Sequence, residues 1–215
     1  MKSLARNFNQ EIVLAEKHLM SACPILRTWI VEQGRCQLEP VWTREPIESL
    51  VRAVAHQQLH GKAAESILRR LIERFPNPSF PSAIQLSRMR VTTYRKCGFS
   101  LAKTETIRGI ARASIDDTIP DRARAGAMSD EVLIETLTQL KGIGKWTVEM
   151  FLIFTLGRLD VMPIDDFGVR AGLMHLYGLD GMPKKSEFAT RTDSWKPYRS
   201  VGAWYLWRMA DARKQ

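Results

Sequence analysis

The chain has 215 residues, of which 45% are apolar, and it carries a formal net charge of +9 with a pI near 9.7. This composition excludes a disordered chain, and no apolar run is long enough to cross a bilayer, so we expect a globular protein with no membrane partner. The excess of positive charge favours a polyanionic partner such as nucleic acid.

The N-terminal twenty residues contain charges throughout and no apolar signal core, so no secretion signal is expected. The three cysteines, Cys23, Cys36 and Cys97, are widely spaced and form no metal-binding motif. We therefore expect reduced thiols and a cytoplasmic protein, associated with the nucleoid if the source is bacterial.

Apolar residues recur at helical spacing through nearly the whole chain, and alternating β patterns are almost absent. In chain order, the pattern predicts helices over 9–22, 24–34, from 46, 62–75, 82–88, 91–96, from 100, from 129 or 130, 147–156, 167–177 and 199–212. We therefore expect an all-α, two-lobed bundle of about ten helices. One lobe is predicted to combine residues 1–41 with 157–215, and the central lobe to span 42–156 and to end in a helical hairpin over 130–156.

The stretch QLKGIGKWT separates two of these helices. Gly142 and Gly144 permit positive φ, so the chain can reverse within a few residues, while Ile143 can enter the core. The free amides of the next helix, with Lys141 and Lys145 beside them, would form an anion site suited to a DNA phosphate. The alternative is an ordinary turn between helices, in which the glycines serve only to end the first one.

Two acidic residues, Asp165 and Asp166, stand at the start of the helix predicted over 167–177. One aspartate can cap the helix while the other projects from its first turn. Adjacent acids repel DNA, which suggests a chemical reason for their presence in a basic protein. The alternative is that both simply cap the helix and stabilise its dipole.

The longer stretch LKGIGKWTVEMFLIFTLGRLDVMPIDD resembles the signature of helix-hairpin-helix DNA glycosylases, and is most similar to the 3-methyladenine DNA glycosylase II type. The resemblance extends over about residues 45–210, with Lys141 at a position where proline is common. It implies that the second aspartate, Asp166, is catalytic, that Asp165 is its capping neighbour, and that Gly142 to Lys145 and Thr147 belong to the DNA-binding hairpin.

The resemblance also implies the reaction, which is removal of alkylated purines from duplex DNA as free bases. Relatives that also cut the strand use a lysine where this chain has Trp146, so a monofunctional enzyme is expected. No cysteine follows Cys97, so the iron–sulfur cluster of some relatives is not expected, nor is any other cofactor. A monovalent ion on the hairpin carbonyls is compatible with the resemblance, and a monomer is expected.

Two further segments, AHQQLHGKAA and CGFSLAKTETI, are similar to family segments. In the family, the first supplies the side chain that fills the gap left by a flipped base, and the candidates are Gln57, Gln58, Leu59 and His60. Additional phosphate contacts are predicted at Gly61, Lys62, Ser100 and Lys103. The alternatives are polar residues at an exposed helix end and a simply capped helix.

An aromatic group in the second half of the chain could attract a cationic alkylated base. Trp146, next to the hairpin, and Trp204 are the predicted pocket residues, although Trp204 and Trp207 can equally be core residues on one helix face. The base is expected in a cleft between the lobes, beside Asp166. The rival hypotheses are a noncatalytic helix-hairpin-helix DNA-binding module and a bifunctional glycosylase/lyase.

Overall fold

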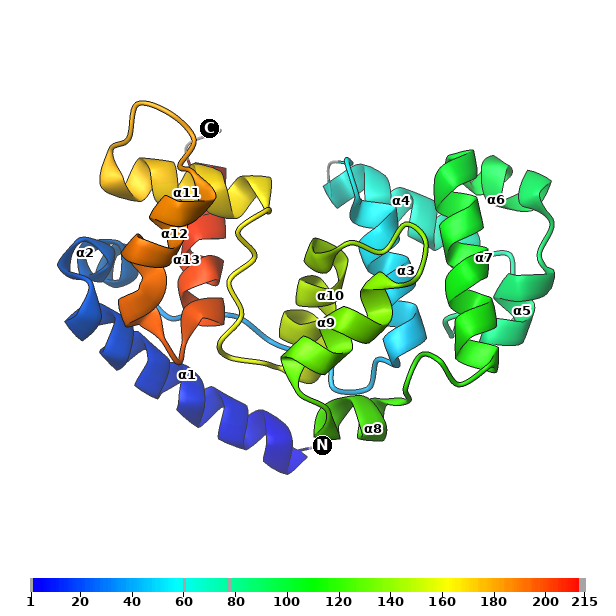
Figure 1. The fold of residues 1–215 in the computed structure, drawn as a ribbon, viewed down its shortest axis with the longest axis horizontal. Helices are drawn as coiled ribbons and strands as arrows, with labels where there is room; N and C mark the ends of the chain where they lie inside the picture. The colour runs from blue at the N-terminus through cyan, green and yellow to red at the C-terminus, as the bar shows by residue number, and fades with distance from the viewer. Residues whose placement is uncertain (1, 60, 77–78, 213–215) are drawn as a thin grey trace. The chain divides into compact units, whose positions relative to one another are not determined.

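The computed structural model describes residues 2–59, 61–76 and 79–212, and within them the regular structure is entirely helical (Figure 1). The predicted all-α class is confirmed, but the described part of the chain contains thirteen α-helices instead of about ten. None of the described helices is both long enough and apolar enough to span a membrane. The chain folds as two units, Thr43–Phe151 and Met1–Trp42 with Leu152–Gln215.

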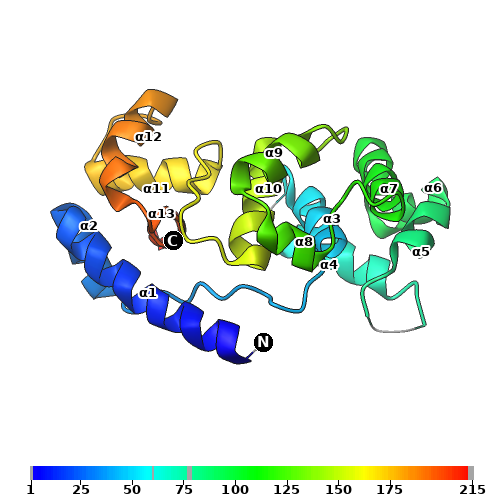
Figure 2. The same cartoon turned by 60° about the horizontal axis from the view of Figure 1, so that its bottom comes forward.

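The terminal unit joins both ends of the chain. Its elements are α1 (Lys2–Ala22), α2 (Pro24–Gln33), a π-helix η1 (Leu152–Leu156), α11 (Phe167–Tyr177), α12 (Lys185–Thr192), a 3₁₀ turn η2 (Asp193–Trp195) and α13 (Arg199–Ala212). The pairing of α11 with α13 is the most extensive in this unit, while α1 and α2 lie along one side of it (Figure 2). Gly172 lies against the backbone of Leu206, where the absence of a side chain lets α11 and α13 approach closely.

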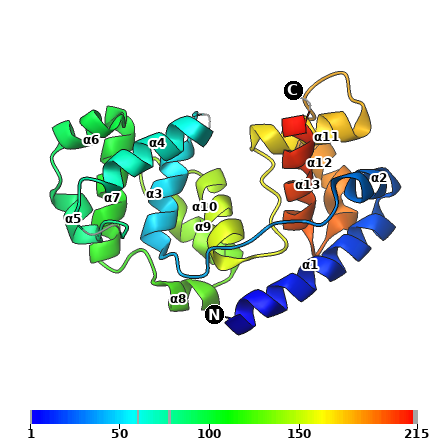
Figure 3. The same cartoon turned by 180° about the vertical axis from the view of Figure 1, so that it is seen from behind.

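The central unit contains α3 (Pro46–His56), α4 (Gly61–Ile72), α5 (Ala83–Arg88), α6 (Val91–Cys97), α7 (Leu101–Ile115), α8 (Arg122–Ala127), α9 (Asp130–Thr138) and α10 (Lys145–Phe151). Helix α3 is the centre of this unit, because it packs against α4, α7 and α10 and buries most of its residues (Figure 3). Helix α3 is strongly amphipathic, with its apolar residues gathered on the face that packs in the core.

Local signals set many of the helix ends. Serines or aspartate cap α5, α7, α8 and α9, each accepting a hydrogen bond from the amide three residues later. Pro24 and Pro46 occupy the first helical position, where a missing N–H costs nothing. The sequence analysis missed α8 and α12 because both are short and carry almost no apolar periodicity.

The connection from the central unit back to the terminal unit differs from the prediction. Residues 152–156, assigned from the sequence to the central lobe, belong to the terminal unit as the π-helix η1. There the Phe154 carbonyl accepts a hydrogen bond from the Val41 amide at 2.9 Å, and the Phe154 ring lies 5.5 Å from the ring of Trp207. These partners lie far away in sequence, so no local pattern reveals them.

Candidate active site and hairpin

The segment that leads into the two aspartates is fixed to the start of α13. Ser200 Oγ donates to the Arg158 carbonyl at 2.7 Å and accepts from the Val161 amide at 2.9 Å. The Arg199 guanidinium binds both carboxylate oxygens of Asp160, at 2.6 and 3.0 Å. Because bidentate pairs of this kind fix geometry as well as charge, the chain enters α11 from a defined position.

Asp166 is held by donors from two helices. Its Oδ1 accepts a hydrogen bond from the Val169 amide at 2.9 Å, which makes Asp166 the N-cap of α11, and a second from Trp207 Nε1 of α13 at 2.8 Å. The side chain is half-buried. The carboxylate therefore has a set orientation, and the close packing of α11 on α13 maintains it.

The positions of Asp165 and Asp166 at the start of α11 differ from the expected ones. Asp165 was expected to cap the helix and Asp166 to project from its first turn. Instead Asp165 is exposed and its carboxylate lies 2.7 Å from Lys185 Nζ. The helix begins at Phe167, and the extended backbone of Asp166 lets its side chain reach back to the third amide of α11.

Trp207 is the functional candidate that sequence reasoning did not select. Its ring contacts Phe154, its N–H donates to Asp166, and it is half-buried between them. The predicted pocket residue Trp204, one turn earlier, packs edge-on against Tyr205 with the Arg208 guanidinium 5.7 Å from its ring. The sequence does not distinguish Trp204 from Trp207, because the two side chains differ only in the residues that each one contacts in the fold.

Trp146 is the other predicted pocket residue. It lies on the first turn of α10 in the central unit and is half-buried. No contact with a base is tested for either tryptophan, so the pocket assignment of Trp146 and Trp204 stays a prediction.

The turn between α9 and α10 has the expected compact form. Ile143 is 4% exposed and enters the core, as predicted. Gly142 has φ +85°, and a Cβ there would lie 2.1 Å from Thr106 Oγ1 of α7, so this position requires glycine. Gly144, in contrast, does not adopt the positive φ that glycine permits, and among the described residues no atom beyond its chain neighbours lies within 4 Å of where its Cβ would be.

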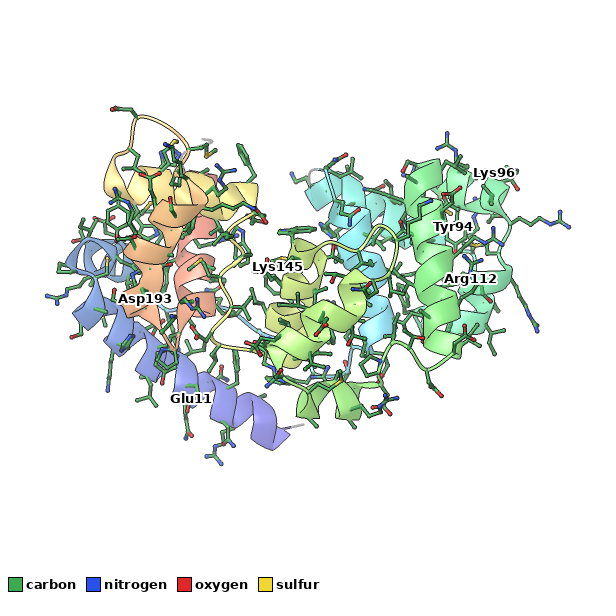
Figure 4. All side chains as sticks on the ribbon, in the orientation of Figure 1. Glu11, Tyr94, Lys96, Arg112, Lys145 and Asp193 are labelled. Atoms are coloured by element: carbon green, nitrogen blue, oxygen red, sulfur yellow. The ribbon has the colours of Figure 1, made fainter. Side chains whose placement is uncertain are left out.

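The two hairpin lysines differ in exposure and partner. The Lys141 side chain is 90% exposed, with its Nζ 3.8 Å from a Glu105 carboxylate oxygen. Lys145, labelled in Figure 4, is about half exposed, and its Nζ lies 3.6 Å from the buried carboxylate of Glu149. The Lys141 pair is exposed at both ends and contributes little to stability, so this ammonium group can exchange Glu105 for a phosphate. Lys145 instead stays beside a buried carboxylate, whose charge it neutralises.

The loop between α3 and α4 separates its candidate residues into two kinds. Gln57 is turned inward, and its Nε2 donates to the Gly142 carbonyl and to Thr147 Oγ1, both at 3.1 Å. Gln58 and Leu59 are exposed, and Gln58 has an unusual φ of +54°. His60 lies outside the described residues. Thr147, predicted to contact DNA, is 1% exposed, so its side chain is a partner of Gln57 instead.

The remaining predicted phosphate contacts divide in the same way. Gly61 and Lys62 are exposed at the start of α4. Ser100 caps α7 by accepting from the Lys103 amide at 3.2 Å. The Lys103 ammonium does not point to solvent, because it donates to two backbone carbonyls of the α3 terminus, and burial lowers its pKa. The ammonium group therefore has two backbone partners in this structure, and the phosphate contact of Lys103 stays a prediction.

Residues 51–197 match the family model described as HhH-GPD superfamily base excision DNA repair protein. The chain belongs to this superfamily. The matched range contains the loop after α3, the α9–α10 hairpin and Asp166, and it ends before Arg199, Ser200 and Trp207 of α13. The predicted resemblance to helix-hairpin-helix glycosylases is thereby confirmed.

Individual HhH-GPD relatives resemble the chain over most of its length. DNA-3-methyladenine glycosylase 1 of Schizosaccharomyces pombe is 46% identical over 165 residues, covering 77% of this chain and 72% of the relative. The alkylbase DNA glycosidase-like protein mag2 of the same organism is 37% identical over 196 residues, covering 91% and 92%. The solved structure of S. pombe Mag1 in complex with abasic DNA has a TM-score of 0.87 at 41% identity and covers 90% and 95%.

The HhH-GPD hairpin allows a matched test of its two glycines. Replacing Gly144 by alanine is expected to leave the melting temperature within about 2 °C of the wild type, because the described part of the chain leaves open space at the position of the new methyl group. Affinity for duplex DNA should fall by about tenfold, since the methyl group keeps a phosphate from the amides of α10. Thermal melting and fluorescence anisotropy measure the two effects.

Gly142→Ala is the control, because it clashes with Thr106 and should lower the melting temperature. Unchanged DNA affinity in a folded Gly144→Ala variant would remove this face of the hairpin from the DNA contact.

Proposed function

We propose that this protein is a monofunctional DNA glycosylase that hydrolyses the N-glycosidic bond of alkylated purines in duplex DNA and leaves an abasic site. The single observation that carries the proposal is the Asp166 carboxylate, fixed by hydrogen bonds from Val169 and Trp207 in an HhH-GPD protein. Two of its relatives bear the names DNA-3-methyladenine glycosylase 1 and alkylbase DNA glycosidase-like protein, which supports alkylated bases as the substrate class.

The chemistry needs a fixed negative charge more than it needs an acid. Breaking the bond between sugar and base builds positive charge on the deoxyribose, as in other glycoside hydrolyses. A carboxylate beside that carbon stabilises the transition state, and it can also orient or deprotonate the attacking water. An alkylated purine already carries positive charge and leaves as a neutral base, so no strong general acid is required.

Water is the proposed nucleophile. The position after the hairpin that holds a lysine in strand-cutting relatives is Trp146 here, and an indole forms no Schiff base. Its neighbour Lys145 is directed toward Glu149, at 3.6 Å. A covalent enzyme–DNA intermediate is therefore not part of the proposed mechanism.

In the proposed binding mode, one segment of the protein binds the DNA backbone and another enters the base stack. The hairpin, with Lys141 and Lys145 beside it, binds a phosphate without reading sequence, and the exposed tip of the loop at Gln58 and Leu59 enters the duplex while the damaged nucleotide is flipped out. We propose that the protein acts in the cytoplasm as a monomer, without an organic cofactor or an iron–sulfur cluster, and that a monovalent ion on the hairpin carbonyls is compatible with this function.

The direct test is the identity of the released base. Duplex DNA treated with a methylating agent should yield free alkylpurines, identified by mass, when it is incubated with the protein. Borohydride should trap no protein–DNA adduct. Absence of any released base would favour the noncatalytic DNA-binding module, and a trapped adduct would favour the glycosylase/lyase.

A further inference from the structure

One lysine, Lys103 of α7, binds the backbone at the start of the loop after α3. Lys103 Nζ donates to the Ala55 carbonyl at 2.9 Å and to the Gln57 carbonyl at 2.6 Å. These are carbonyls at the C-terminal end of α3, where a helix has unpaired acceptors and negative dipole charge. A charged donor with two short bonds in a half-buried position fixes the backbone where the loop begins.

One glutamine of the same loop, Gln57, forms hydrogen bonds to the hairpin. Both bonds from Gln57 Nε2 end on hairpin residues, one on the Gly142 carbonyl and one on the buried hydroxyl of Thr147. A primary amide has two N–H donors, so both donors of this side chain are used by the hairpin. Gln57 is 85 residues from Gly142 and 90 residues from Thr147 in the sequence. The two hydrogen bonds therefore join the loop after α3 directly to the hairpin.

Helix α7 supports both segments from one face. Lys103 on its first turn holds the loop, and Thr106, three residues later, packs against Gly142 of the hairpin. Residues three apart on a helix lie on the same side, so a single rigid element sets the distance between the two.

The tip of the loop shows the consequence. Gln58 has φ +54°, a conformation that a residue with a side chain rarely adopts and that persists only where its surroundings impose it. Leu59 follows with 40% of its surface exposed, so an apolar side chain stands at the end of the fixed loop. Both residues stand directly after the carbonyl that Lys103 holds.

We propose that Lys103 and Gln57 are positioning residues that fix the loop tip relative to the hairpin, so that phosphate binding and entry of the tip into the duplex occur together. The inference rests on the proposed function, because it concerns the flipped-base complex. Neither residue contacts the base or the sugar. They act through Gln58 and Leu59, whose ordering is completed before DNA binds and therefore costs no affinity at that moment.

The test is a ratio of affinities that does not depend on catalysis. Binding is measured to a duplex containing a tetrahydrofuran abasic analogue and to the same duplex undamaged, with 2-aminopurine beside the analogue to report unstacking. Lys103→Met and Gln57→Met should each lower the preference for the abasic duplex about tenfold and reduce the 2-aminopurine signal. Affinity for undamaged duplex should stay within about twofold, because the hairpin still binds phosphate.

Lys96→Met is the matched control, since it removes one exposed lysine of α6 from the same unit without touching the loop (Figure 4). Thermal melting is recorded for every variant, and if Lys103→Met does not fold, Gln57→Met carries the test. An unchanged preference, an equal loss in Lys96→Met, or a parallel loss for both duplexes would each overturn the inference. Base release by the wild type is measured separately, so failure of the proposed function is seen independently of this result.

Discussion

Replacing Asp166 by asparagine is expected to lower the single-turnover rate of base excision by about 100- to 10,000-fold, with little change in fold or in DNA affinity. Asparagine is also a good N-cap, and its side-chain oxygen can accept the bonds from Val169 and Trp207. The variant therefore keeps the geometry and loses the negative charge that stabilises the sugar cation. This separation of charge from structure is the reason for choosing asparagine over alanine.

The neighbouring residue provides the control for this experiment. Asp165→Asn removes the same charge one residue away, from an exposed side chain that pairs with Lys185. It should excise bases at close to the wild-type rate. Excision from a methylated duplex under enzyme excess, with melting temperature and DNA affinity measured in parallel, decides the matter. A near-normal rate for Asp166→Asn, or equal losses in both variants, would refute the catalytic assignment.

The largest expected effect on stability is at Gly172. A Cβ at this position would lie 2.1 Å from the Leu206 carbonyl oxygen, which belongs to the backbone of α13 and cannot move aside as a side chain could. Gly172→Ala is expected to destabilise the protein by about 3 kcal/mol, at the upper end of overpacking costs. For a chain of this size the melting temperature should fall by about 6 to 12 °C.

Activity should fall with stability in this variant, because Asp166 caps α11 and Trp207 lies on α13, and separating the helices breaks the hydrogen bond between the two side chains. Gly181→Ala in the same unit has open space around the new methyl group and serves as the comparison in a thermal melt. A wild-type melting temperature for Gly172→Ala would show that α11 and α13 are not as closely packed as described.

The hairpin and the aspartate pair show how far local patterns reach. GIG between two apolar helical patterns predicted both the reversal and the buried Ile143, because turn formation depends on residues adjacent in sequence. The same reasoning could not tell which glycine has no room for a side chain, since that depends on Thr106 of α7. It also assigned the cap to Asp165, because either of two neighbouring aspartates satisfies a capping pattern.

Local patterns were enough to predict the helical class, many helix starts and the hairpin, since caps, prolines, glycines and apolar spacing act within a few residues of one another. The family followed from the resemblance of one stretch to a known signature. The long-range partners of the polar side chains could not be predicted in this way. Trp207 meets Asp166 across 41 residues, Lys103 meets Ala55 across 48, and Gln57 meets Thr147 across 90. A long-range hydrogen bond forms only where the packed helices bring two groups together. The periodicity along a single helix shows which residues share a face, but it does not show which residues of another helix they contact.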